Sequence, residues 1–223
     1  MTAAFDSVTV ETGLNPQHCV IWMHGLGADG YDFVPIVKEL DQMGLPPTRF
    51  VFPHAQEMPV SINGGYVMRA WYDIRNVDLQ RQEDEDGVRA SQARIEALIE
   101  QQLATGIKSE HIVLAGFSQG GAIAYQTGLR YTAPLGGLIC LSTYLTCESS
   151  LDGERSPANQ NTPLFIAHGD HDDIVVIERG QRAAQLLRER GYNIEWHSYP
   201  MTHALCGEEV VAIAEFLNQV FKP

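Results

Sequence analysis

Ser118 is the residue of this sequence whose surroundings point most directly to chemistry. It stands between Gly116 and Gly120, and the apolar run 112–115 comes directly before the first of these glycines. A serine at a tight strand-to-helix turn has a strained backbone, and residues with a β-carbon do not fit two positions before and after it. The alanine-rich stretch 121–125 follows with helical character. We therefore expect a nucleophile elbow, a turn that exposes the Ser118 hydroxyl for attack on a substrate.

An exposed serine needs two further side chains, because its hydroxyl is a weak nucleophile at neutral pH. A histidine must accept the proton, and an acid must orient that histidine. In hydrolases built around such an elbow, the acid follows the serine along the chain and the histidine comes last. His203 stands in a predicted loop before the last helix and suits the base. Asp170, Asp172 and Asp173 lie together after an apolar run and compete for the place of the acid.

The elements that must position these residues alternate along the chain. Short apolar runs are separated by amphipathic stretches, which is typical of a mostly parallel sheet with helices on both faces. The predicted strands are 5–10, 18–24, 49–52, 111–117, 136–141, 164–168 and 193–199, and the predicted helices are 32–43, 87–105, 119–131, 176–190 and 207–221. The first strand is expected at an antiparallel edge. The stretches 53–86 and 142–162 lack a regular pattern and are expected to form long loops near the site.

Several motifs, taken in their order along the chain, resemble a known family: the small serine carboxylesterases of the α/β-hydrolase fold, which include the acyl-protein thioesterases. The motifs are HGLGADG at 24–30, WYDI at 71–74, GFSQGG at 116–121, HGDHD at 168–172 and MTH at 201–203. The resemblance covers almost the whole chain and implies a mostly parallel, twisted α/β-hydrolase sheet without a large lid domain. It implies that Ser118 is the nucleophile, Asp172 the acid and His203 the base. It also implies an oxyanion hole made by the backbone amides of Leu26 and Gln119.

The bulk composition indicates a soluble protein. Its 223 residues suit a single α/β domain, 1–223, with one large core. The sequence has no apolar run long enough for a membrane span, and its first residues lack the features of an export signal. The four cysteines have no disulfide-framework spacing. We therefore expect a cytoplasmic protein with reduced thiols and no integral membrane association. The net charge of −13 disfavours nucleic acid as a partner.

Two acidic stretches, 170–173 and 83–86, raise the question of a calcium site. Neither has the glycine and the distal glutamate of a twelve-residue calcium loop. The run 83–86 is instead expected to be a solvated turn before a helix. Cys206 lies close to His203 but has no partner pair for zinc. We expect no metal and no cofactor, and we expect His24 and His168, each followed by glycine at a strand end, to brace the site.

The long stretch after residue 53 carries an apolar and aromatic segment. We expect this segment to form one wall of an acyl-binding groove beside Ser118, with Met68, Trp71 and Tyr72 as the substrate-binding candidates. Its apolar and aromatic residues are Met58, Val60, Ile62, Tyr66, Val67, Met68, Trp71 and Tyr72. Ordinary packing is the competing interpretation, because an aromatic run in a long loop can simply anchor that loop.

The activity that we expect is hydrolysis of carboxylic esters with short to medium acyl chains through an acyl-enzyme on Ser118. The resemblance includes two alternatives that share this chemistry, an acyl-protein thioesterase and a lysophospholipase. An alternative of a different class is a catalytically dead hydrolase fold that binds a ligand. The expected partner is a small ester or acyl-thioester substrate, and because the family contains dimers, a homodimer is also expected.

Overall fold

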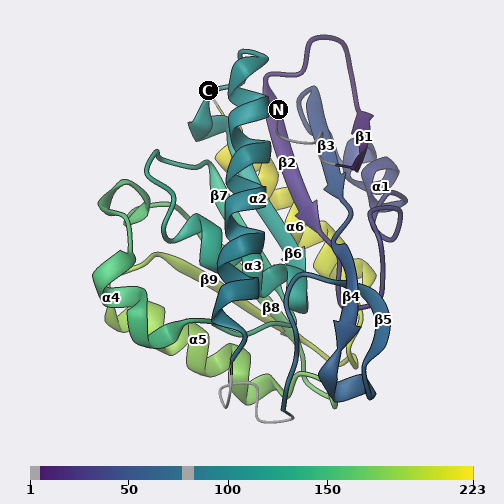
Figure 1. Ribbon diagram of the computed structural model, residues 1–223. Coiled ribbons are helices and arrows are strands. Elements are labelled where there is room, and N and C mark those ends of the chain that lie inside the picture. Colours follow the sequence, from purple (N-terminus) through teal and green to yellow (C-terminus); the bar gives the residue numbers. More distant parts are fainter. Residues whose placement is uncertain (1–5, 77–82, 223) are drawn as a thin grey trace.

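The computed structural model describes residues 6–76 and 83–222. A seven-stranded sheet runs through the molecule in the order β1-β3-β2-β6-β7-β8-β9 (Figure 1). Its strands are β1 (Ser7–Glu11), β2 (His18–Met23), β3 (Thr48–Pro53), β6 (Ile112–Phe117), β7 (Gly137–Leu141), β8 (Leu164–Gly169) and β9 (Ile194–Tyr199). β1 pairs antiparallel with β3, and all the other neighbours pair parallel. The predicted fold class is confirmed, including the antiparallel edge; Phe5, placed in the first predicted strand, lies outside the described residues.

Helices cover both faces of this sheet. Side chains of α2 (Glu85–Ala104), α3 (Gln119–Gly128) and α5 (Ile177–Glu189) form a core on one face. Side chains of α1 (Ile36–Gln42) and α6 (Gly207–Val220) form a core on the other. In Figure 1, α2 passes in front of the sheet and α6, in yellow, passes behind it. None of the helices in the described ranges is long and apolar enough to cross a bilayer.

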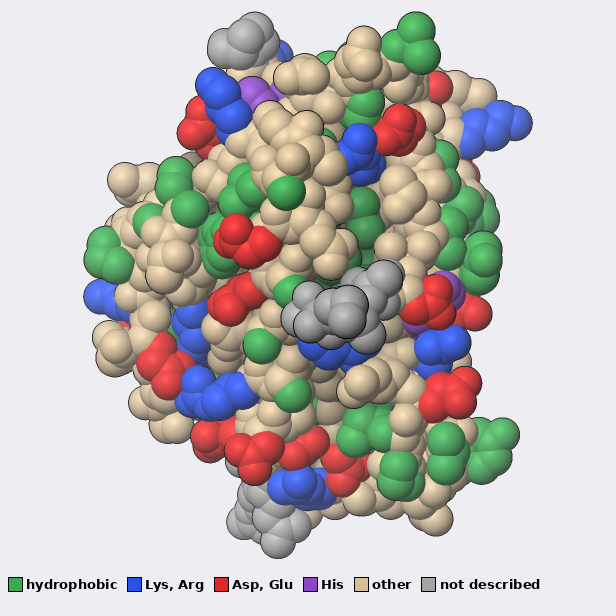
Figure 2. Space-filling model, turned by 45° about the horizontal axis from the view of Figure 1, so that its top comes forward, with side chains coloured by type: hydrophobic (Ala, Val, Ile, Leu, Met, Phe, Trp, Pro, Cys, Tyr) green, Lys and Arg blue, Asp and Glu red, His purple; other side chains and the backbone are tan. Residues whose placement is uncertain are grey.

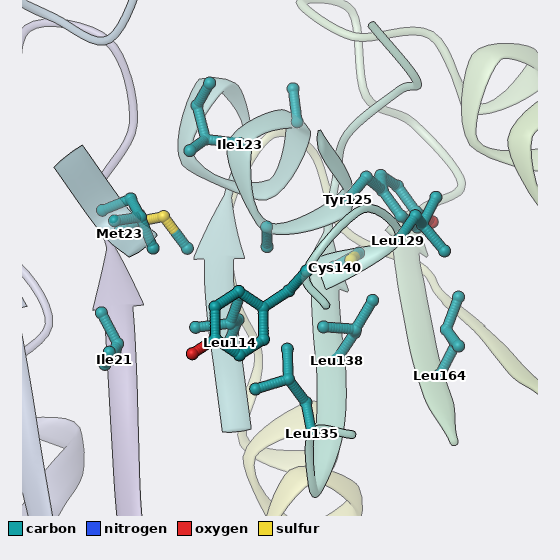
Figure 3. Packing of buried hydrophobic residues seen from close by; sticks show 14 of the residues in the cluster. Ile21, Met23, Leu114, Ile123, Tyr125, Leu129, Leu135, Leu138, Cys140 and Leu164 are labelled. Carbon is teal, nitrogen blue, oxygen red and sulfur yellow. The ribbon is translucent and has the colours of Figure 1, made fainter. Parts of the chain in front are cut away.

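The central strands are apolar on both faces because helices cover both. Along β2, Ile21 belongs to one core and Val20 to the other, since successive side chains of a strand point to opposite faces. Figure 3 shows the first core, where side chains from neighbouring strands pack against α3; those labelled include Ile21, Met23, Leu114, Leu138, Cys140, Ile123 and Tyr125. This packing seats α3 on β6 and β7, so the turn that joins β6 to α3 is held from both of its ends.

A hairpin and a short α-helix lie in stretches that were expected to be irregular. The stretch 53–86 contains an antiparallel hairpin of β4 (Gln56–Val60) and β5 (Tyr66–Ala70), and the stretch 142–162 contains the short helix α4 (Leu151–Glu154). Each hairpin strand has one buried residue, Val60 in β4 and Ala70 in β5. β4 also contains Pro59, a residue type that sheets tolerate mainly in their edge strands. The hairpin therefore leaves little hydrophobic periodicity in the sequence. Helix α1 begins at Ile36 rather than at 32, after Pro35 at its N-cap.

Glu209 is buried in the first turn of α6. The residue is 0% exposed, although carboxylates are rarely buried without a partner. Removal from water penalises the charged form, so burial raises the pKa of Glu209 to about 8, against a weaker opposing effect of the Cys206 backbone. At neutral pH, Glu209 is mainly a neutral carboxylic acid.

We expect Glu209→Gln to gain stability relative to the wild type as the pH rises from about 5 to about 8. The unfolded chain ionises this residue near its ordinary pKa of 4.5, whereas the folded protein keeps it protonated up to about 8. In this window the folded state binds more protons, so wild-type stability falls by up to about 1.4 kcal/mol per pH unit. Glutamine has nearly the same shape and does not ionise.

Urea unfolding across this pH range measures the difference in free energy of unfolding between the two proteins. The exposed neighbour Glu208 provides the matched control, and Glu208→Gln should show no such trend. A difference between Glu209→Gln and the wild type that stays constant with pH would contradict the raised pKa.

Candidate active site

The turn between β6 and α3 holds Ser118 in a backbone conformation that is rare for a residue with a side chain. Its φ is 54° and its ψ is −120°, and its N–H donates to the Leu141 carbonyl at 2.8 Å. A β-carbon at Gly116 would lie 2.3 Å from the Gly120 carbonyl, and one at Gly120 would lie 2.3 Å from the Met23 carbonyl oxygen. Side chains are therefore excluded at both positions, and this close approach of backbones makes the strained turn at Ser118 possible.

His203 and Asp172 are joined directly. The His203 Nδ1 lies 2.6 Å from the Asp172 Oδ2, and the Asp172 side chain is 0% exposed. The other carboxylate oxygen, Oδ1, accepts hydrogen bonds from the backbone amides of Ile174 at 3.0 Å and Val175 at 2.8 Å. These bonds fix the orientation of the carboxylate, so the imidazole of His203 is held in a defined plane.

The loop after β8 presents one of its three aspartates to the histidine. The Asp170 N–H donates to the Tyr199 carbonyl at 2.8 Å, and the Asp172 N–H donates to the Gly169 carbonyl at 3.3 Å. Asp170 and Asp173 are exposed, whereas Asp172 is buried. The tight turn thus points the carboxylate of Asp172 inward and those on either side of it into solvent.

Ser118 and His203 line the same cavity, and Leu26 and Gln119 line it with them. The volume of this cavity is about 440 Å³. Besides Leu26, its apolar lining residues are Ala28, Ile62, Ile74, Phe117, Tyr144, Ile174 and Val175. The ring centres of His203 and Phe117 lie 4.6 Å apart, so an aromatic contact flanks the imidazole. The structure therefore gathers the predicted nucleophile, base and oxyanion donors around one largely apolar hollow.

The predicted oxyanion donors are the backbone amides of Leu26 and Gln119, two residues that line the cavity with Ser118. Gln119 is the first residue of α3, and amides at the start of a helix have no acceptor within it. In the other loop, the N–H of Gly27 donates to the Arg69 carbonyl at 2.9 Å and that of Ala28 donates to the Gly25 carbonyl at 3.3 Å. The two amides after Leu26 are thus engaged within the protein, while Leu26 itself faces the cavity.

The side chain of Gln119 ties the start of α3 to the segment after β5. Its Oε1 accepts from the Trp71 N–H at 2.8 Å, and its Nε2 donates to the Tyr72 carbonyl at 2.7 Å. The Trp71 indole donates to the His24 carbonyl at 2.9 Å. Trp71 and Tyr72 are only 2% and 3% exposed. Both residues therefore support the two predicted oxyanion loops from within the protein.

The substrate-binding role of Met68, Trp71 and Tyr72 stays a prediction. None of these three is among the described residues that line the cavity, whereas Ile62 of the same predicted segment is. The Met68 sulfur accepts from the amide of Asn63, a lining residue, at 3.4 Å, and so lies one contact away. Sequence reasoning did not assign binding to Ile74, Tyr144, Ile174 and Val175, which do line the cavity. The apolar pair directly after an acidic loop is the signal that could have identified the last two.

Residues 5–221 match the family described as phospholipase/carboxylesterase. The chain belongs to this family. It is similar to the acyl-protein thioesterase 1 of Gibberella zeae, with 38% identity over 213 residues, which cover 92% of this chain and 91% of the relative. The acyl-protein thioesterase 1 of Neurospora crassa is 40% identical over 210 residues, covering 90% and 85% of the two chains. A probable carboxylesterase of Oryza sativa is 34% identical over 206 residues, covering 91% and 77%.

Solved structures agree with this assignment. Arabidopsis thaliana SOBER1 superposes with a TM-score of 0.85 at 30% identity, covering 92% of this chain and 99% of the other. Zea mays acyl-protein thioesterase 2 superposes with a TM-score of 0.85 at 27% identity, covering 97% and 99%. The resemblance inferred from the motifs is confirmed, and this member of the phospholipase/carboxylesterase family is a hydrolase of ester or thioester bonds.

Two buried histidines brace the site of this family member. His24 donates from Nδ1 to the Gly25 carbonyl at 2.7 Å and accepts at Nε2 from the Ala55 N–H at 3.0 Å. An accepting nitrogen carries no proton, and burial lowers the pKa of His24 to about 4. His168 donates from Nε2 to the Val175 carbonyl at 2.6 Å, and burial lowers its pKa as well. Both histidines are neutral structural groups, and His168 holds the segment that carries Asp172.

The acidic run 83–86 is more than the solvated turn that was predicted. Asp84 is buried and pairs with Arg75 at 2.7 Å, and Glu83 accepts from the Cys147 N–H at 3.1 Å. The expectation was wrong for these two residues because their partners lie outside the run: Cys147 is 64 residues from Glu83, and Arg75 is 9 residues from Asp84. Glu85 and Asp86 are exposed in the first turn of α2. Within residues 6–76 and 83–222, no group of three or more histidine, cysteine, aspartate or glutamate side chains could hold a metal ion.

Gly180 should not tolerate alanine, because α5 crosses directly over His168. A β-carbon at residue 180 would lie 2.4 Å from the His168 Nδ1, and the ring is pinned by its bond to Val175. We expect Gly180→Ala to lower the free energy of unfolding by about 1–3 kcal/mol, as overpacking does. We also expect a lower kcat, because the segment that carries Asp172 is displaced.

Gly153 in α4 is the matched control, because nothing lies within 4 Å of a β-carbon there. Gly153→Ala should be neutral or stabilise by up to about 1 kcal/mol, the difference in helix propensity. Urea unfolding and ester hydrolysis measure the two effects, and equal behaviour of the two variants would rule out the proposed contact with His168.

Proposed function

We propose that this protein is a serine carboxylesterase that hydrolyses carboxylic esters of short to medium acyl chains. Ser118 is the nucleophile, His203 the general base and Asp172 the acid that orients the base. The observation that carries the proposal is the 2.6 Å hydrogen bond between His203 and Asp172, on the cavity that also holds Ser118 at its strained turn. Membership of the phospholipase/carboxylesterase family supports it.

In the proposed acylation step, His203 removes the hydroxyl proton of Ser118 while the oxygen attacks the carbonyl carbon of the ester. Asp172 accepts a hydrogen bond from Nδ1, so the proton of the neutral ring stays on Nδ1 and Nε2 keeps a free lone pair. The charge that develops on the carbonyl oxygen is stabilised by the amides of Leu26 and Gln119. The second of these lies at the positive end of the α3 dipole.

The protonated His203 then donates its proton to the leaving alcohol, and the acyl group stays on Ser118. In the second half-reaction a water molecule gives a proton to His203 and attacks the acyl carbon. When the resulting tetrahedral intermediate collapses, the bond between the acyl carbon and the Ser118 oxygen breaks, His203 returns its proton to that oxygen, and the carboxylic acid is released. Both halves use the same donors, because the carbonyl oxygen occupies the same place in each.

An acyl-protein thioesterase activity has equal support, since relatives 38% and 40% identical to this chain bear that name. A thioester presents the same carbonyl with a thiolate as the leaving group, so the same residues serve. A lysophospholipase would also use them. The apolar lining of the cavity supports burial of an acyl chain in each case. A catalytically dead binding protein is disfavoured, because the predicted catalytic residues meet around one cavity.

Ser118→Ala should abolish hydrolysis of nitrophenyl acetate and butanoate. Asp172→Asn should lower kcat on the order of 10⁴-fold, because an amide nitrogen in place of Oδ2 cannot accept the hydrogen bond from the His203 Nδ1–H and the wrong tautomer is favoured. The fold should persist, because Oδ1 can still accept from the amides of Ile174 and Val175. Steady-state kinetics measure the losses. Asp173→Asn, at an exposed position of the same loop, is the matched control and should be close to wild type.

Labelling by a fluorophosphonate gives an independent readout of the nucleophile. The wild type should be labelled and Ser118→Ala should not. Full hydrolysis by Ser118→Ala would reject the serine mechanism, and equal losses in Asp172→Asn and Asp173→Asn would reject Asp172 as the orienting acid.

We also propose that the protein is a cytoplasmic homodimer. Buried, free cysteines such as Cys19 and Cys140 suit a reducing compartment. Tyr66 and Val67 of β5 are 69% and 57% exposed, and Figure 2 shows hydrophobic side chains gathered at the lower right, the side on which β4 and β5 lie in Figure 1. Exposed apolar patches of this kind often form protein–protein interfaces. Light scattering should give about twice the chain mass of 24.7 kDa, and a value near 24.7 kDa would reject the dimer.

A further inference from the structure

Tyr144 stands between the catalytic cavity and a second hollow. It lines both the cavity of about 440 Å³ that contains Ser118 and a neighbouring cavity of about 310 Å³. The second cavity has an apolar part made by Leu145, Val176 and Ala183. Its other lining residues are charged, namely Glu148, Glu178, Arg179 and Arg182. The tyrosine is therefore a partition, with the reaction centre on one side and an unassigned space on the other.

The partition is rigidly held. Tyr144 is 5% exposed, and its hydroxyl lies 2.7 Å from that of Tyr72, which is itself buried. The preceding residue, Thr143, donates from its hydroxyl to the Ser118 carbonyl at 2.6 Å. The segment of Tyr144 is thus bonded to the Ser118 backbone through Thr143, and the Tyr144 side chain is bonded to the segment after β5 through Tyr72. A side chain fixed at both ends stays in place when a substrate presses on it.

Two apolar lining residues of the catalytic cavity, Ile74 and Val175, are close in sequence to residues that contact Tyr144 or share the second cavity with it. Among the described residues that line the cavity, Asp32 alone carries a carboxylate, and it also lines a third hollow beside α1 and α6. Ile74 lies two residues after Tyr72, the hydrogen-bond partner of Tyr144. Val175 lies next to Val176, which shares the second cavity with the tyrosine. A hydrocarbon chain is stabilised by apolar contacts and is disfavoured beside a carboxylate that it would desolvate.

We propose that the Tyr144 ring is the end wall of the acyl site and sets the longest acyl chain that the enzyme accepts. Removing the ring would join the two cavities, and a longer chain would then extend over Leu145, Val176 and Ala183. Tyr144 is in this sense a residue that determines specificity, and the substrates gained would be esters of long-chain fatty acids. This inference rests on the proposed ester hydrolysis through Ser118.

The test compares kcat/KM for nitrophenyl butanoate and nitrophenyl dodecanoate in the wild type and in Tyr144→Ala. We expect the wild type to favour butanoate, and we expect the dodecanoate-to-butanoate ratio to rise at least about tenfold in Tyr144→Ala, given what single methylene contacts contribute to discrimination. A ratio is used because any general loss of activity cancels. Tyr144→Leu, which keeps an apolar side chain of intermediate size, should give a smaller rise and serves if the alanine variant does not fold.

Tyr144→Phe and Tyr72→Phe are the controls. Each removes the hydroxyl pair but keeps the ring of Tyr144 as a wall, so both should keep the wild-type ratio. A wild type that hydrolyses dodecanoate as well as butanoate would overturn the inference. An unchanged ratio in folded Tyr144→Ala and Tyr144→Leu would also overturn it, as would the same rise in the phenylalanine variants. Failure of the proposed function gives a different result, since Ser118→Ala would then retain hydrolysis of butanoate.

Discussion

The structure depends on how closely three backbones meet at the start of α3. A β-carbon at Gly116 or at Gly120 would lie 2.3 Å from a backbone carbonyl atom, and one at Gly121 would lie 2.7 Å from the Thr143 side chain. The missing side chains let the helix sit directly on β6 and β2. Ser118 is consequently forced to a φ of 54°, a strain that the packed sheet must offset. The nucleophile is therefore positioned by the centre of the sheet, which is the most constrained part of the molecule.

The same sheet explains why residues far apart in the sequence meet. β2, β6, β7, β8 and β9 are all parallel, so the loops at their carboxyl ends lie along one edge. Leu26 follows β2, Ser118 follows β6 and Tyr144 follows β7, while Asp172 and His203 follow β8 and β9. Each loop contributes one feature of the site. The chemistry and the shape of the acyl cavity are thus two consequences of one strand order.

The difference between the regular strands and the loops that follow them also accounts for what the sequence could predict. The central strands of the sheet are continuous apolar runs, and the elbow has a glycine pattern, so fold class and nucleophile could be inferred from local residues. Which aspartate of 170–173 faces inward could be inferred only from family resemblance, since it depends on how one tight loop turns. The β4–β5 hairpin escaped prediction because each strand buries a single residue. From the sequence, Trp71 and Tyr72 suited either the wall of an acyl groove or internal packing. The hydrogen bonds that hold them inside the protein join them to Gln119, 48 and 47 residues away, and local sequence does not reveal such bonds.

These bonds place one short segment behind both halves of the site. Tyr72 accepts from the Gln119 side chain through its carbonyl and pairs with Tyr144 through its hydroxyl. Its backbone therefore supports the predicted oxyanion donor, while its side chain supports the proposed end wall. A change that moved the Tyr72 backbone would disturb transition-state stabilisation, whereas removal of the Tyr144 ring would change the cavity and leave the bond between Gln119 and the Tyr72 carbonyl in place. A substitution at residue 144 can then change the accepted acyl-chain length while the catalytic geometry remains fixed. Oxyanion stabilisation and chain-length selection both depend on Tyr72, but through different atoms of it.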